Sequence, residues 1–146
     1  MGKVSIRDYN NFDNKICSLK EAQEWCEVMR YSPCENFFAT GSHDNIVYVY
    51  SVSDAGEYTL YKSFNKHTSF VTAFDWSQDS SYIRSQCGAY DKLYFNIAEK
   101  QHDASGLSNT KDKEWATTTL KLGWDVQGIH PASEDGSHIN GVMVCK

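Results

Sequence analysis

Short stretches with alternating or β-favouring hydrophobic residues recur along the chain, separated by polar turns. They carry β-branched and aromatic residues, which favour strands. The intervening Ser42–Asn45 has the composition of a turn. Apart from the short window Leu19–Trp25, no part of the chain shows helical periodicity, so the pattern predicts antiparallel strands. The first complete set of four predicted strands is Lys15–Lys20, Trp25–Tyr31, Phe37–Gly41 and Ile46–Val52.

This pattern repeats. Trp25 aligns with Phe70 and Tyr50 with Phe95 at a constant offset of 45 positions, and Val4–Asp8 aligns with Val47–Ser51 at an offset of 43. A further partial copy begins at Ile139. Units of four short strands at this period are the signature of β-propeller blades.

The predicted fold class is therefore all-β, a partial β-propeller built from antiparallel four-stranded blades in an open array. The expected four-stranded sheets are Lys15–Val52 and Tyr58–Ile97. Because propellers usually have about four to eight blades, we expect the isolated chain to self-associate or to be part of a longer protein. The units expected along the chain are a last strand in 1–10, blades in 11–55 and 56–98, and a partial blade in 99–146 with a long loop at Ala98–Lys113. The expected core is Val28, Phe38, Val47, Val49, Val71, Ala73, Ile83 and Leu93.

Charge and composition exclude several classes of partner. The chain has 14 Lys and Arg against 19 Asp and Glu, a formal net charge of −5. An acidic chain is not expected to bind nucleic acid or anionic membranes non-specifically. No apolar run approaches the roughly 20 residues that span a bilayer. The five cysteines form no CxxC pair, so we expect reduced, mostly buried thiols in a reducing compartment.

Particular residues resemble those of a WD-repeat blade. His67 precedes the strand Phe70–Trp76, as the family's His precedes its inner strand, and Asp44 occupies the turn before the last strand. The Trp-Asp position is degraded to Tyr50-Ser51 and Phe95-Asn96, and Ala89 replaces the second turn Asp. The resemblance implies that His67 is a structural hydrogen-bonding residue in an incomplete His–Asp–Trp network.

A closer resemblance lies in the last third of the chain. Glu114–Thr117, Gly128–Pro131, Asp135-Gly136 and Ile139-Asn140 form an ordered series that resembles the C-terminal propeller of echinoderm microtubule-associated protein-like proteins. His130 stands where that family has Trp. The resemblance implies a tubulin- or microtubule-binding propeller, cytoplasmic and cytoskeleton-associated. The alternative is a general WD-repeat interaction scaffold with no cytoskeletal role. Tubulin has an acidic surface, so binding by this segment would need a local basic patch, such as one involving Lys62, Lys66 and Arg84; otherwise the binding surface would lie on other blades.

The candidate site is a protein-binding rim. Trp25 and Phe70 begin equivalent inner strands, where large aromatic side chains could anchor a partner. Packing between blades is the alternative for both. His43, Arg84 and Tyr90 lie near the next turns and could share this rim, or be solvated turn residues.

No catalytic, metal or cofactor site is predicted. His130 and His138 flank a polar turn, but no third ligand is spaced to complete a metal site. No Ser-His-Asp order, phosphate-binding loop or paired acid is present. The sequence therefore predicts a non-enzymatic protein-binding scaffold.

Overall fold

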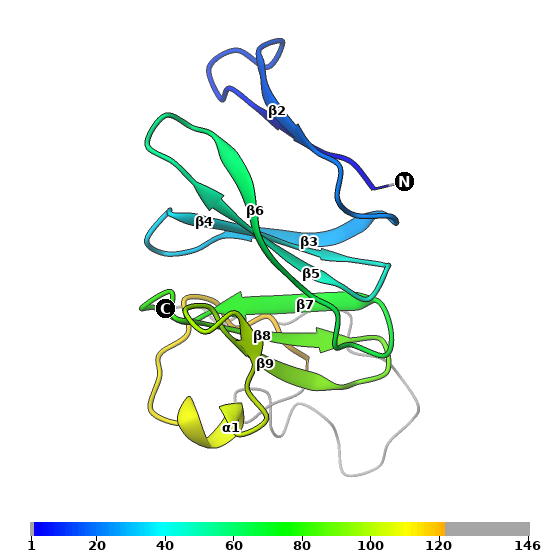
Figure 1. The fold of residues 1–146 in the computed structure, drawn as a ribbon, viewed down its shortest axis with the longest axis vertical. Helices are drawn as coiled ribbons and strands as arrows, with labels where there is room; N and C mark the ends of the chain where they lie inside the picture. The colour runs from blue at the N-terminus through cyan, green and yellow to red at the C-terminus, as the bar shows by residue number, and fades with distance from the viewer. Residues whose placement is uncertain (1, 122–146) are drawn as a thin grey trace.

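The computed structural model describes residues 2–121 of the chain. Three antiparallel β-sheets are stacked one above another, with a two-stranded hairpin at the top of Figure 1 and two four-stranded sheets below it. The sheets do not close into a ring within these residues. The predicted all-β, partial-propeller fold is confirmed.

The N-terminal hairpin pairs β1 (Val4–Arg7) with β2 (Lys15–Leu19). The first four-stranded sheet has the order β3-β4-β5-β6. The second has the order β7-β8-β9-β10. Strand bounds in the first sheet are Cys26–Tyr31, Phe37–Ser42, Val47–Val52 and Tyr58–Phe64, and in the second Val71–Trp76, Tyr82–Cys87, Lys92–Asn96 and Gln101–His102.

The strands group into sheets differently from the prediction. The ranges Lys15–Val52 and Tyr58–Ile97 are not the two sheets, because β2 pairs with β1 and β6 pairs with β5. The first sheet thus takes its fourth strand from the next sequence unit. A tandem repeat has the same period from any starting residue, so the period could not show where a sheet begins.

The 45-residue offset reappears in the backbone geometry. Glu35 and Ser80 both have positive φ, as do Asn45 and Tyr90 in the following turns. Each pair is separated by 45 positions. The bulges at the start of β3 and β7 are also equivalent. The two four-stranded sheets are therefore copies of one structural unit.

The central strands of the first sheet are buried on both faces, because one face packs on the second sheet and the other packs toward the hairpin. In β5, Val47 and Val49 pack into a core shared with the second sheet, and Tyr48 and Tyr50 pack toward the hairpin. The core between the four-stranded sheets also contains Phe74, Trp76, Ile83 and Phe95. Of the predicted core, Phe38, Val47, Val49, Val71, Ala73 and Ile83 are buried, and Val28 and Leu93 are partly buried against the core.

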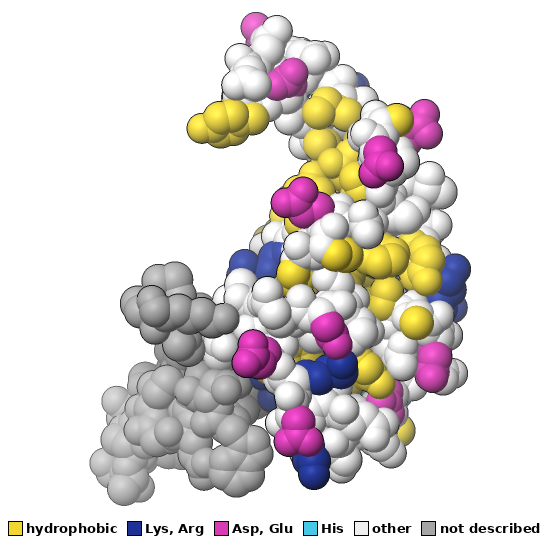
Figure 2. Space-filling model, turned by 90° about the vertical axis from the view of Figure 1, so that its left-hand side faces the viewer, with side chains coloured by type: hydrophobic (Ala, Val, Ile, Leu, Met, Phe, Trp, Pro, Cys, Tyr) yellow, Lys and Arg dark blue, Asp and Glu magenta, His cyan; other side chains and the backbone are white. Residues whose placement is uncertain are grey.

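Large hydrophobic side chains are exposed on the hairpin and on the first sheet. They gather over the upper part of the molecule in Figure 2. This surface is apolar enough to pack against further protein. The exposed residues in these elements are Tyr9, Phe12, Ile16, Met29, Tyr31 and Leu60.

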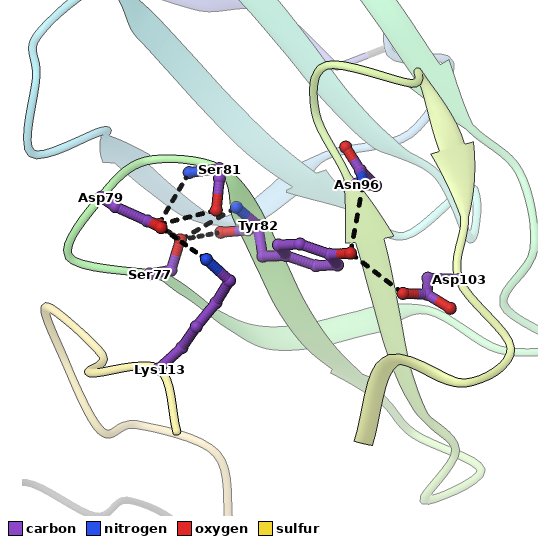
Figure 3. Close-up of polar contacts among 7 residues, drawn as sticks. All are labelled: Ser77, Asp79, Ser81, Tyr82, Asn96, Asp103 and Lys113. Carbon is purple, nitrogen blue, oxygen red and sulfur yellow. Dashed lines mark hydrogen bonds and ion pairs between the residues drawn. The ribbon is translucent and has the colours of Figure 1, made fainter. Parts of the chain in front are cut away.

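The predicted long loop after β9 is ordered by polar contacts with the second sheet (Figure 3). It contains β10 and the short helix α1 (Gly106–Asn109). The Tyr82 hydroxyl donates to the Asp103 carboxylate at 3.0 Å, and Lys113 forms an ion pair with Asp79. Burial raises the pKa of Asp79, but hydrogen bonds from Lys113, Ser77 and Ser81 outweigh it and hold the pKa below its usual value.

The four cysteines within the described residues are free thiols, but their burial differs from the prediction. Of the four within the described residues, only Cys87 is buried, Cys17 and Cys26 are half-buried, and Cys34 is exposed. Cys145 lies outside the described residues. None of the described helices is long and apolar enough to cross a membrane.

Candidate protein-binding rim

The candidate rim lies at one end of the two four-stranded sheets. In the first sheet, the amide of His43, in the β4–β5 turn, donates to the carbonyl of Trp25 before β3. In the second sheet, the amide of Gly88 donates to the carbonyl of Phe70 in the same way. These equivalent bonds hold the residue before β3 beside the β4–β5 turn, and the residue before β7 beside the β8–β9 turn. The four segments form one edge of the molecule.

Three aromatic rings form a stack across the two sheets. The His43 ring is 3.6 Å from Trp25 and 4.5 Å from Phe70, centroid to centroid, and is nearly parallel to both. Two rings this close cannot occupy the same face of an imidazole, so His43 lies between Trp25 and Phe70. The stack joins neighbouring sheets, which is the packing alternative raised for these aromatics. It nevertheless leaves Trp25 57% exposed.

Glycine at position 88 makes the stack possible. A Cβ atom there would lie 2.6 Å from Cε1 of Phe70, so a larger residue would displace that ring. His43 occupies the equivalent position in the first sheet. Tyr90 follows in the same turn as Gly88, with positive φ and 56% exposure. The structure therefore brings Trp25, His43, Phe70 and Tyr90 to one edge.

Glu27 is a rim residue that the sequence analysis missed. Its carboxylate lies 2.8 Å from Nε2 of His43. This contact orients the imidazole within the stack. Alternation gave no clear signal for it, because Glu27 lies at the β-bulge that begins β3.

The prediction that Arg84 lies on the rim is wrong. Arg84 is in β8, only 4% exposed, with Nε 3.1 Å from the carboxylate of fully buried Asp75. Its guanidinium also lies 4.4 Å from the ring centroid of Trp115. Asp75 was overlooked as a partner, and pairing lets this Arg occupy an interior position that an unpaired charge could not.

Asp75 also holds the segment that follows the long loop. Its carboxylate accepts hydrogen bonds from the hydroxyls of Thr117 at 2.6 Å and Thr119 at 2.9 Å. Trp115 forms a β-bridge with Ser77 at the end of β7. The described part of the Glu114–Asn140 series therefore runs along the free edge of the second sheet.

His67 has a structural setting, as predicted. It is buried, and its Nε2 lies 2.6 Å from the Ser85 hydroxyl. Burial lowers the pKa of His67 to about 4, an effect that nearby Asp91 opposes and His102 supports. Asp91, two residues beyond Ala89, accepts a hydrogen bond from Thr68 in the same region. Hydrogen bonds from other residues thus replace part of the His–Asp–Trp network.

His130 and His138 lie outside the described residues. Within residues 2–121, no group of three His, Cys, Asp or Glu side chains is arranged to hold a metal ion.

Comparison with known proteins identifies relatives along the whole chain. The family model described as echinoderm microtubule-associated protein second beta-propeller matches residues 1–146. The ciliary WD repeat-containing protein ctxp80 of Euplotoides octocarinatus is 43% identical over 97% of this chain and 19% of its own length. Human echinoderm microtubule-associated protein-like 1 is 43% identical over 84% of the chain and 15% of its own length. The chain spans less than a fifth of these curated relatives.

A solved structure shares the fold. A chain in the crystal structure of the mitotic checkpoint complex matches 69% of this chain and 31% of its own length, with a TM-score of 0.62 and 17% identity. At this identity the likeness concerns the fold alone. The family match over the full sequence is more specific, and it agrees with the repeated blades and with the Glu114–Asn140 resemblance. The chain belongs to the family of echinoderm microtubule-associated protein second β-propellers.

Proposed function

We propose that this chain is a segment of a non-enzymatic scaffold that associates with microtubules or tubulin. The observation that carries the proposal is the family match over residues 1–146. Its relatives include proteins named as microtubule-associated. The scaffold acts in the cytoplasm, on the cytoskeleton, by surface recognition rather than by chemistry.

The aromatic rim is one protein-recognition surface of this scaffold. Trp25 and Tyr90 are large and exposed, one directly before β3 and the other in the turn between β8 and β9. Aromatic anchors of this kind supply much of the affinity of protein interfaces. Arg84 is excluded from any basic surface patch by its burial, which leaves Lys62 and Lys66 of the three basic residues considered.

Co-sedimentation of the full-length parent protein with microtubules tests the cytoskeletal proposal. We expect the parent to pellet with microtubules and Lys66→Gln to reduce the pelleted fraction. Glu57→Gln, in the turn at the other end of the first sheet, is the control. Absence of binding by the unaltered parent would refute the cytoskeletal role. A pull-down that recovers other proteins but no tubulin would favour the general WD-repeat scaffold.

The partner of the exposed apolar surface is further propeller structure. The hairpin has only two strands, and large hydrophobic side chains remain exposed beside it. Open strand edges and apolar faces promote association with another chain. We expect the isolated 146-residue chain to self-associate in light scattering at roughly tens of micromolar. A monodisperse monomer that unfolds cooperatively would contradict this.

A further inference from the structure

Trp25, the outer ring of the aromatic stack, presents a face suited to binding a cation. His43 covers one face of Trp25, yet more than half of the Trp25 side chain remains exposed. The face of an indole carries negative electrostatic potential and attracts guanidinium and ammonium groups. The stack also fixes the ring, so a ligand would not have to order it.

The charge around the aromatic stack is negative, which also favours a cationic ligand. The rim segments 20–27, 42–46, 65–70 and 87–91 contain five carboxylates and two lysines. Glu24 and Glu27 lie on either side of Trp25 in the sequence and are exposed. An acidic rim attracts a cationic partner and repels an anionic one.

We propose that this rim binds an arginine-bearing peptide segment, with the guanidinium stacked on the outward face of Trp25 and the carboxylates of Glu24 and Glu27 beside it. Arginine fits better than lysine because its planar, weakly hydrated guanidinium stacks on aromatic rings and pairs with carboxylates at the same time. The proposal concerns a peptide ligand of the rim and does not rest on microtubule association.

The test uses the full-length parent protein, in which further propeller structure covers the exposed apolar surface, and a synthetic peptide, acetyl-Gly-Gly-Arg-Gly-Gly-amide. The matched control peptide carries citrulline, which keeps the planar shape and loses the charge. Binding is followed by NMR through the backbone amides of His43 and Gly88 and the indole N–H of Trp25. We expect saturable shifts at these positions with the arginine peptide and much smaller shifts with citrulline.

Three substitutions separate the contributions. Glu27→Gln removes the charge but keeps an oxygen that can accept from Nε2 of His43, so the stack persists. We expect Glu27→Gln to weaken the arginine peptide about two- to fivefold, as for a partly exposed charge contact. Trp25→Ala should abolish saturable binding, and Glu57→Gln should leave it unchanged.

Two results would overturn the proposal. One is equal binding of the citrulline peptide, and the other is unchanged arginine-peptide affinity in Trp25→Ala. Both measurements are independent of microtubule co-sedimentation, so either proposal can fail while the other stands.

Discussion

Lowering the pH should destabilise the fold through His67. Its imidazole is buried against the Ser85 hydroxyl, and its Nδ1 has no hydrogen-bond partner within the described residues. Protonation would place a second N–H donor and a positive charge at that buried site. This explains why burial lowers the pKa of His67 to about 4 from the ordinary 6.5.

The sign and size of the effect follow from linkage. Between pH 6.5 and 4 the unfolded chain binds a proton at this position and the folded chain does not, so the free energy of unfolding falls as the pH falls. The full shift corresponds to about 3 kcal/mol, and about 2 kcal/mol is lost by pH 5. That is a large part of the roughly 5–15 kcal/mol that typically stabilises a domain.

Urea unfolding of the chain and of His67→Gln at pH 8 and pH 5 measures the effect, with both proteins at the same concentration so that self-association contributes equally. Glutamine retains a polar group for Ser85 but does not titrate. The unaltered chain should lose about 2 kcal/mol more than His67→Gln between these pH values. The difference between the two chains cancels the contributions of other groups, including Asp91 and His102. Equal pH dependence in both would refute the reasoning.

Three further substitutions test the packing, each by urea denaturation. Asp75→Ala should cost about 3–5 kcal/mol, because it leaves Arg84 buried without its carboxylate, and adding Arg84→Met should restore part of the loss. Val71→Asp should prevent folding, because Val71 is fully buried between the sheets; a soluble variant that unfolds cooperatively would count against that position. Gly41→Ala should cost about 1–3 kcal/mol, because the new Cβ would lie 2.6 Å from Val71 and 2.7 Å from Val28; unchanged stability would show that both valines yield freely.

Local patterns predicted the strands and the repeat well. The alternation of Val47 and Val49 with Tyr48 and Tyr50 marked β5 correctly, because strand neighbours point to opposite faces. It did not show that both faces are buried, since that depends on the hairpin stacking above the sheet. The repeat period likewise could not show at which strand each sheet begins.

The rim was predicted in part. Trp25 and Phe70 were found because equivalent repeat positions carried large aromatics. Arg84 was misplaced because its partner, Asp75, lies in a different strand, and Trp115 comes from a segment far along the chain. The cross-strand pair of Arg84 with Asp75 depends on strand register, and the contact with Trp115 depends on the fold, so neither leaves a mark in local alternation. His43 was predicted to lie on the rim. Its position between the rings of Trp25 and Phe70 could not be predicted, because it depends on how the neighbouring sheet packs.

The pairing of β6 with β5 determines where this chain can be cut. A break at residue 55, between two sequence units, would remove the fourth strand from one sheet and leave it as an unpaired strand at the head of the other fragment. Two such fragments would be complementary, each carrying what the other lacks. A break within 65–70 would leave both four-stranded sheets whole. Shortened versions of this protein should therefore begin or end after β6, and fragments divided at residue 55 should recombine when mixed.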